Sequence, residues 1–348
     1  DTAVRRGDDP RSDIRPAILR IAAVAASALV LAGCSSSDSD SAAESTDDAA
    51  ASEDSDDSGG SGPKICMVTH GDGGGFWSVA KAGADKAGED LPVQFTYQET
   101  TNDAQLQAQL IESFISECCE GIAVYAPKPD AISQALSKAD EAGIAIVTMN
   151  SGSKVFKDLG AFTHVGQDEF IAGQEAGLKF KEAGKSKVLC PIQEQNNIGL
   201  QERCDGAADT FGNVENLQLS AGLADIAQSQ AEIQAKLEAD PDIDAVFALN
   251  ADIATQAAQP AAEAVGRDIM VGTVDLSGEA VQSIADGDLA FAIDQQQYAQ
   301  GYMSVVLLYL NLINGHELGG GQPIYTGPGF VLQDNAELVQ ELAANGTR

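Results

Sequence analysis

Beyond residue 62, the sequence alternates short aliphatic runs with longer segments whose apolar residues recur every three or four positions. Turns rich in Gly, Asp and Asn separate these segments, which is the pattern of strands alternating with amphipathic helices. The aliphatic runs predict strands at residues 65–69, 93–97, 121–125, 145–149, 187–190, 217–220, 245–249 and 270–274. The periodic segments predict helices that include residues 77–89, 103–118, 129–142, 169–183 and 226–239.

Helices that connect successive strands make the strands run in the same direction, through right-handed crossovers. Two sets of four or more strands fit within residues 63–348, which indicates two lobes. The sequence therefore predicts an α/β fold built from two doubly wound parallel-sheet lobes. In such sheets ligands bind beyond the carboxyl ends of the strands, so the residues that follow each strand are candidates for a site.

Polar and aromatic residues follow several of the predicted strands. The candidates at or near strand ends are Phe76, Trp77, Asn150, Arg203, Asn250, Asp275 and Gln295. Amide, carboxylate and guanidinium groups exchange hydrogen bonds with hydroxyls, and an aromatic face packs on the C–H side of a sugar. A single polar residue could be only a turn-former or an N-cap, but turns do not require the arginine, the glutamine or the aromatic pair. Together these residues predict a site for a small molecule rich in hydroxyls.

The first 33 residues have the pattern of a secretory signal. Arginines precede an apolar run at residues 21–32, which is too short to span a bilayer. The run ends in Leu31-Ala32-Gly33-Cys34, which resembles the lipobox of bacterial lipoproteins and implies a lipid on Cys34. An ordinary cleaved signal is the alternative. Residues 34–62 continue as an acidic linker without aromatic or large aliphatic side chains, which predicts a disordered tether. We therefore expect a protein secreted across the inner membrane and lipid-anchored on its outer face.

The composition narrows the partners. The chain has 53 acidic and 20 basic residues and a formal net charge of −33. This charge repels phosphate backbones, which excludes a nucleic-acid partner, and it argues against a strongly anionic ligand. The sequence has no CxxC pair, no histidine cluster and no metal-ligand spacing, so we expect neither a metal nor a cofactor.

Six cysteines suit an oxidising compartment. Cys190 lies at the end of a predicted strand and Cys204 in the next helix, so these two are the predicted disulfide. Either Cys118 or Cys119 could reach Cys66, and the sequence does not decide between them.

Several stretches between residue 64 and about residue 329 form a family pattern. They are Phe76-Trp77 followed by Gly83, residues 142–150, Glu202-Arg203-Cys204-Asp205-Gly206, residues 240–250, residues 271–275, Asp286-Gly287 and Asp294-Gln295. Together they resemble the periplasmic sugar-binding proteins of ABC importers, the group that includes the ribose- and galactose-binding proteins. The resemblance implies the type I periplasmic binding protein fold, in lipoprotein form here, and a binding protein rather than an enzyme.

The resemblance also implies roles for the candidate residues. In that family the two early aromatic residues stack on the sugar, which implies Phe76 and Trp77 here. The arginine of the family corresponds to Arg203, and its late asparagine, aspartate and glutamine correspond to Asn250, Asp275 and Gln295. Asp72 substitutes for a polar residue that the Gly73–Gly75 insertion displaces, and Asn150-Ser151 stands where the ribose binder has Asp-Arg. The implied ligand is a pentose, a hexose or a polyol such as a tetritol, pentitol or inositol.

The implied organisation is two lobes joined by three hinge segments. The N-terminal lobe comprises residues 63–166 plus 297–324, and the C-terminal lobe comprises residues 167–296 plus 325–348. The implied function is that a monomer captures a small neutral sugar or polyol in the cleft between the lobes. The lobes close around the ligand, and ABC permease subunits in the membrane recognise the closed form.

Other functions remain open from the residues alone. A receptor of the same fold for a sugar-like signal, as in autoinducer sensing or chemotaxis, or for a nucleoside, would use the same cleft. An NAD-dependent oxidoreductase would use Gly71-x-Gly73 as the start of a dinucleotide fingerprint. However, Phe76 stands where the third glycine should allow close helix packing, and the sequence offers no catalytic base with a partner.

Overall fold

Two six-stranded sheets organise the part of the chain that the computed structural model describes, residues 62–71 and 74–348. The first sheet has the order β11-β5-β4-β3-β1-β2, and all of its pairs are parallel. Its strands are β1 (Lys64–Thr69), β2 (Gln94–Glu99), β3 (Gly121–Tyr125), β4 (Ala145–Met149), β5 (Thr163–Gln167) and β11 (Ile324–Gly327).

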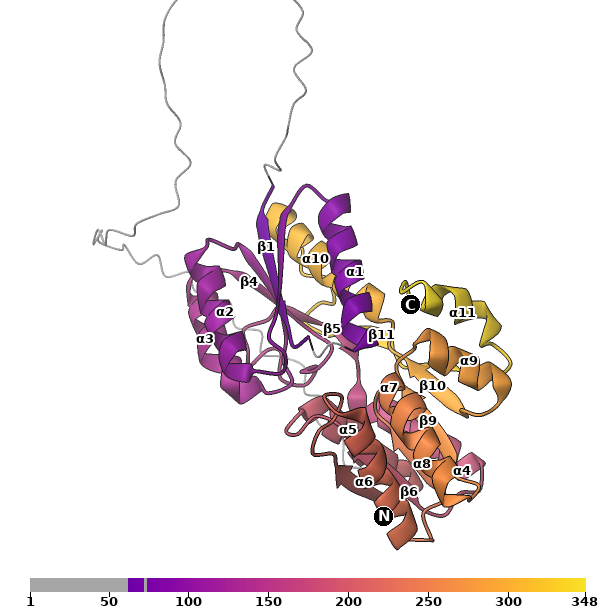
Figure 1. Cartoon of the computed structure of the whole chain (residues 1–348). Coiled ribbons are helices and arrows are strands. Elements are labelled where there is room, and N and C mark those ends of the chain that lie inside the picture. Colours follow the sequence, from indigo (N-terminus) through magenta and orange to yellow (C-terminus); the bar gives the residue numbers. More distant parts are fainter. Residues whose placement is uncertain (1–61, 72–73) are drawn as a thin grey trace, which may run out of the picture. The chain divides into compact units, whose positions relative to one another are not determined.

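Helices cover both faces of the first sheet. Helices α1 (Gly75–Asp90) and α10 (Gln297–Asn314) pack together on one face, and α2 (Ala104–Ser116) and α3 (Pro129–Glu141) pack on the other (Figure 1). Strand β1 shows why both are needed, since Ile65 and Met67 belong to one apolar cluster and Cys66 and Val68 to the other. A parallel strand buried on both faces is a continuous apolar run, and such a run is the pattern that predicted it.

The second sheet repeats this arrangement. Its order is β12-β10-β9-β8-β6-β7, with all pairs parallel except β10 with β12. The strands are β6 (Val188–Ile192), β7 (Val214–Gln218), β8 (Ala245–Ala248), β9 (Met270–Val274), β10 (Phe291–Asp294) and β12 (Gly329–Val331). Helices α4 (Glu169–Glu182) and α5 (Ile198–Phe211) cover one face. The other face is covered by α6 (Ile226–Ala239), α7 (Ala251–Ile253), the π-helical turn η1 (Ala254–Ala258), α8 (Gln259–Val265), α9 (Gly278–Asp286) and α11 (Glu337–Ala344).

The chain passes between the two sheets three times. It leaves the first sheet after β5 and enters α4 of the second lobe, and it returns between β10 and α10. The third passage joins β11 of the first sheet to β12 of the second through Pro328. Strand β11 runs to Gly327 within the first sheet. These passages are where a hinge would have to lie.

The predicted two-lobe α/β architecture is confirmed, and the differences from prediction are local. The strand predicted at 217–220 is instead β7 (Val214–Gln218), which begins earlier. It is the outermost strand of its sheet, so it tolerates the adjacent polar residues Glu215 and Asn216, which hide its start in the sequence. Strand β6 extends past the predicted end at residue 190 to Ile192, through Pro191. Proline, which has no N–H, is tolerated because pairing with β8 extends only to Leu189, whereas pairing with β7 continues.

The signal, the lipidated Cys34 and the acidic linker predicted at residues 34–62 lie outside the described residues, apart from Gly62. Within residues 62–71 and 74–348, no helix combines the length and the apolar character that crossing a bilayer requires.

Candidate ligand-binding site

A pocket lies where strand ends of both sheets meet. Seven predicted site residues line it together, namely Phe76, Trp77, Asn150, Arg203, Asn250, Asp275 and Gln295. The eighth, Asp72, lies outside the described residues. The pocket also contains residues that were not predicted as site residues, namely Tyr125, Ser151, Gln193, Glu194, Asn197, Leu200 and Leu249.

The first lobe contributes the aromatic wall. Phe76 and Trp77 lie in the first turn of α1, and their rings meet edge to face with centroids 4.9 Å apart. Trp77 also packs against Tyr125, at the end of β3, with centroids 4.6 Å apart. Packing on both sides holds the indole, which is only 4% exposed, in one position. The wall can therefore present a fixed aromatic surface to the C–H face of a ligand.

A chain of amide and carboxylate groups joins the lobes on another side of the pocket. The Asn150 side-chain amide, just after β4, donates to Gln295 Oε1 at 3.0 Å and to Gln300 Oε1 at 3.2 Å. Gln295 in turn donates through Nε2 to the Asp275 carboxylate. Asn150 and Asp275 have φ values of 60° and 77°, a left-handed conformation that residues other than glycine rarely adopt. Such backbone geometry clusters at ligand sites, because the surrounding fold must hold it in place.

Arg203 on α5 is the buried cation of the pocket. Its Nε donates to Glu169 Oε2 at 2.6 Å and its Nη2 to Glu169 Oε1 at 3.1 Å, while Nη1 donates to the Leu249 carbonyl at 3.0 Å. Burial by itself would lower the pKa of Arg203, but the Glu169 carboxylate raises it above its ordinary value. The guanidinium is therefore charged and fixed in orientation by the fold.

Close packing of α4 against α5 makes this pairing possible. A Cβ atom added at Gly206 would lie 2.0 Å from the Phe170 carbonyl oxygen, and one at Gly173 would lie 2.1 Å from the Arg203 carbonyl oxygen. Only glycine permits the two backbones to approach so closely. Glu169, the first residue of α4, is 1% exposed and holds the arginine.

A polar cluster that was not predicted as part of the site closes the remaining side. Glu194, in the loop after β6, has its Oε1 3.2 Å from His70 Nε2, and its Oε2 accepts from Asn197 Nδ2 at 2.7 Å. Asn197 Nδ2 also donates to Tyr125 Oη at 2.8 Å. Burial opposes ionisation of Glu194, but His70 and Asn197 outweigh it and leave the pKa of the carboxyl below its ordinary value. Burial also raises the pKa of the Tyr125 phenol, which stays neutral.

The sequence contained a signal for Glu194. Residues directly after a strand are the candidates for a site, but the strand was predicted to end at Cys190, three residues short of Gln193 and four short of Glu194. The observed strand ends at Ile192, so both residues follow it directly.

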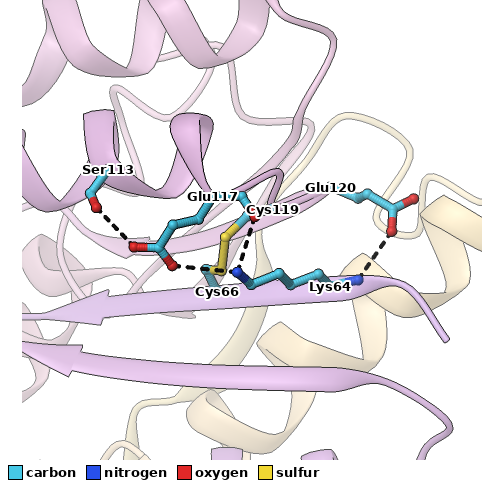
Figure 2. The surroundings of a disulfide bond; sticks show 6 residues. All are labelled: Lys64, Cys66, Ser113, Glu117, Cys119 and Glu120. Atoms are coloured by element: carbon cyan, nitrogen blue, oxygen red, sulfur yellow. Dashed lines mark hydrogen bonds and ion pairs between the residues drawn. A yellow bond between two sulfur atoms is a disulfide. The ribbon is translucent and has the colours of Figure 1, made fainter. Parts of the chain in front are cut away.

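Each lobe contains a disulfide. Cys190 and Cys204, the predicted pair, are joined at an S–S distance of 2.06 Å, although Cys190 lies within β6 and Cys204 midway along α5. Cys66 of β1 is joined to Cys119, which answers the question that the sequence left open (Figure 2). Beside it, Lys64 Nζ donates to the Glu117 carbonyl at 3.0 Å. This disulfide lies toward the amino ends of the strands, whereas the pocket lies beyond their carboxyl ends.

Within the described ranges, no group of three or more His, Cys, Asp or Glu side chains is placed to hold a metal ion. Phe76, which interrupts the dinucleotide fingerprint, is a buried lining residue of the pocket.

Comparison with known proteins identifies the family. Residues 65–317 match the model of the periplasmic binding protein domain, which is more than half of the chain. The chain belongs to this family. A xylose/arabinose-binding protein from Sulfolobus acidocaldarius is 27% identical over 293 residues, which cover 79% of this chain and 72% of that protein. The ribose import binding protein of Bacillus subtilis is 25% identical over 228 residues, covering 64% of this chain and 72% of the relative.

A solved structure agrees with this assignment. It is a carbohydrate transporter from Acidothermus cellulolyticus in complex with myo-inositol. Its identity to this chain is 37%, its TM-score is 0.79, and the match covers 82% of this chain and all of that one. The predicted type I periplasmic binding protein fold is therefore confirmed, and so is the resemblance to the sugar-binding members of the family.

Proposed function

We propose that this protein captures a neutral sugar or polyol in the pocket between its lobes and delivers it to an ABC importer. The observation that carries the proposal is the chemistry of the pocket, where aromatic faces of the first lobe adjoin amide, carboxylate and guanidinium groups of the second. Relatives named for xylose, arabinose and ribose support the same class. Because the similar solved structure contains myo-inositol, cyclic polyols are the first compounds to test.

The lining residues would divide the work. Phe76 and Trp77 would pack on the C–H face of the ligand. The hydroxyls would be held by the polar groups of the strand ends, namely Asn150, Asn250, Asp275 and Gln295, with Asp72 as a further candidate. Arg203 would contribute N–H groups that Glu169 and the Leu249 carbonyl do not use, since a guanidinium has five N–H donors.

The three passages between the sheets would act as the hinge. Contacts such as the 2.8 Å hydrogen bond from Asn197 of the second lobe to Tyr125 of the first join the lobes across the pocket. A ligand that touches both lobes stabilises this closed arrangement by its additional contacts, and the permease would recognise the closed surface. We expect a monomer to suffice, because the described pocket is built from a single chain.

We also propose that the protein works outside the cytoplasm and is attached to the membrane by a lipid on Cys34. The support is the sequence of residues 1–34, an arginine-rich start followed by an apolar run and Leu-Ala-Gly-Cys. Mass spectrometry of the N-terminal peptide from the native host should show a diacylglycerol mass on Cys34. A Cys34→Ser variant should leave the membrane fraction, and unchanged membrane association would contradict the anchor.

The test of function uses the fluorescence of Trp77, which is the only tryptophan of the chain and lines the pocket. Titration with inositols, pentoses, hexoses and linear polyols should change the emission with at least one compound. The same compound should raise the melting temperature, because a ligand at 1,000 times its Kd adds about 4 kcal/mol to the free energy of unfolding. Asp275→Ala should abolish both responses.

The panel should also contain nucleosides, an autoinducer-like furanose and NADH. A response to a nucleoside or furanose alone would favour the receptor or nucleoside alternatives, and a response to NADH alone would favour an oxidoreductase. No response to any sugar or polyol would contradict the proposed function.

A further inference from the structure

Glu194 is a second carboxylate in the pocket besides Asp275, and the family resemblance assigns it no role. It lies in the loop that follows β6, within the segment closed by the Cys190–Cys204 disulfide. Its side chain is 11% exposed, and it lines the pocket beside the aromatic wall. Burying a carboxylate removes its charge from water, which is costly unless partners compensate. The burial of Glu194 therefore calls for hydrogen-bond donors around it.

The partners of Glu194 orient it but do not use all of its capacity. Oε1 lies 3.2 Å from His70 Nε2, without the angle of a hydrogen bond, and Oε2 accepts from Asn197 at 2.7 Å. His70 is itself fixed between Trp77 and Tyr125, with ring centroids at 6.0 and 5.3 Å. A carboxylate has about four lone-pair positions, so two contacts leave room for donors from a ligand.

The other charged groups of the pocket are engaged by the protein in a different way. Both oxygens of Glu169 face Arg203, which makes that pair an internal support of the second lobe. Asp275 is oriented by Gln295, the residue that directly follows β10. Glu194 differs because its neighbour His70 belongs to the opposite lobe. Its position therefore depends on both lobes being together around the pocket.

We propose that Glu194 is a specificity-determining residue, which accepts a hydrogen bond from one particular hydroxyl of the captured sugar or polyol. The inference rests on the proposed function and adds to it the residue that distinguishes one epimer from another. Glu194 requires a hydroxyl donor next to the aromatic wall, so ligands that direct a C–H group there leave a buried carboxylate without that partner. A buried acceptor left unsatisfied is costly, which is how a site rejects a close analogue.

The experiment compares two glutamates of the same segment. Glu194 lines the pocket, whereas Glu202 on α5 pairs with Lys154 of the first lobe at 3.2 Å but does not line it. Calorimetric titrations of wild type, Glu194→Gln and Glu202→Gln would use myo-inositol, scyllo-inositol, D-xylose, D-ribose and D-galactose. We expect Glu194→Gln to weaken the best ligand roughly 10- to 100-fold and to narrow the differences between epimers. Glu202→Gln should stay within about twofold.

A ligand-based cycle sharpens the test. For the best ligand, each mono-deoxy analogue removes one hydroxyl. One analogue should bind the wild type as weakly as the full ligand binds Glu194→Gln. The same analogue should bind Glu194→Gln little more weakly than the full ligand does, because the two changes remove the same contact. Should Glu194→Gln fail to fold by circular dichroism, Glu194→Asp keeps the charge and withdraws it by one methylene. It should still change the ranking of epimers.

Three outcomes would overturn the inference. Unchanged affinity and ranking in Glu194→Gln would remove Glu194 from the ligand contacts. An equal loss of affinity in Glu202→Gln would show that negative charge between the lobes, and not a contact with the ligand, determines the affinity. If the loss of affinity from every deoxy analogue simply adds to the loss from Glu194→Gln, then Glu194 accepts a hydrogen bond from none of the hydroxyls tested. In all three the wild type binds a ligand, so the proposed function stands, whereas absence of any binding by the wild type would overturn both.

Discussion

The two lobes share one topology but supply different chemistry to the pocket. Setting aside β11 and β12, the strand orders are 5-4-3-1-2 in the first lobe and 10-9-8-6-7 in the second, which is the same pattern in chain order. Nevertheless, the aromatic lining residues all come from the first lobe, and the ionisable groups Glu194, Arg203 and Asp275 all come from the second. The fold therefore fixes where the site lies, and the loops at the strand ends fix what each side of it can bind.

The buried groups of the two lobes differ in the same way. In the first lobe, His164 of β5 is fully buried, and burial lowers its pKa to about 3, so it stays neutral. Behind the second lobe's wall lies the charged pair of Arg203 and Glu169. The first lobe thus depends on apolar packing, whereas the second depends on compensated charge. This contrast can be tested by changes that affect one lobe at a time.

The largest effect is expected from Arg203→Ala. The change would leave the Glu169 carboxylate buried without its guanidinium, which costs about 3–5 kcal/mol in free energy of unfolding. Ligand binding should also be lost. Chemical denaturation should reveal the loss, with Lys138→Ala as the control, because Lys138 pairs with Glu112 at the surface of the first lobe with both side chains about half exposed. The control should lose about 1 kcal/mol or less. Equal losses of stability in Arg203→Ala and Lys138→Ala would contradict the view that the second lobe depends on its buried charge pair.

The Cys190–Cys204 and Cys66–Cys119 disulfides should differ in their effect on binding. The Cys190–Cys204 bond spans 14 residues, and that segment contains Glu194, Asn197 and Arg203 of the pocket. Replacing both cysteines by alanine should cost about 3 kcal/mol of stability and weaken ligand binding roughly tenfold or more, because the segment gains conformational freedom. The Cys66–Cys119 bond spans 53 residues that include Phe76 and Trp77, but these two lie in α1, which packs against α10 and holds them independently of the bond. Replacing both cysteines should therefore cost comparable stability but leave affinity within about twofold. The measurement is the Kd of each double variant by calorimetry. Similar losses of affinity in both would contradict the prediction that only the Cys190–Cys204 bond supports the pocket.

Acid should weaken the first lobe through His164. Because its folded pKa is about 3 and its ordinary value is 6.5, the unfolded chain takes up a proton as pH falls below 6.5 while the folded chain does not. Its contribution to stability is therefore lost between about pH 6.5 and 3, by up to about 1.4 kcal/mol per pH unit. His164→Asn should remove that part of the slope, whatever its effect at pH 7. Parallel stability profiles of the variant and the wild type between pH 4 and 6 would contradict a buried neutral imidazole.

The smallest effect is expected at the rim, where Glu202 of α5 pairs with Lys154 of the first lobe. The lysine is about half exposed, so water screens the pair and it contributes about 0–1 kcal/mol. Thermal denaturation of Glu202→Gln should show a shift of a few degrees at most. A loss near that of Arg203→Ala would mean that this partly exposed pair contributes as much to stability as the buried pair does.

The rule that ligands bind beyond the carboxyl ends of parallel strands found half of the residues that line the pocket, because burial on both faces makes a parallel strand recognisable in the sequence. Asn250 and Asp275 each end such an apolar run, and the structure places both at the pocket. The rule failed for Glu194, because Pro191 marked a premature end of its strand. It could not find Tyr125, whose position inside an apolar run is that of a core residue. Its hydroxyl nevertheless reaches Asn197 of the other lobe.

The sequence by itself determined the alternation of strands and helices, the two lobes and the edge of each sheet at which a ligand can bind, because these depend on local periodicity and chain direction. The tertiary structure decided which distant groups meet. Three contacts depend on how separate elements pack. Arg203 pairs with Glu169, Glu194 faces His70, and Cys119 rather than Cys118 joins Cys66. Local patterns do not encode these contacts, since each joins residues that are far apart in the chain and meet only when the elements that carry them have packed together.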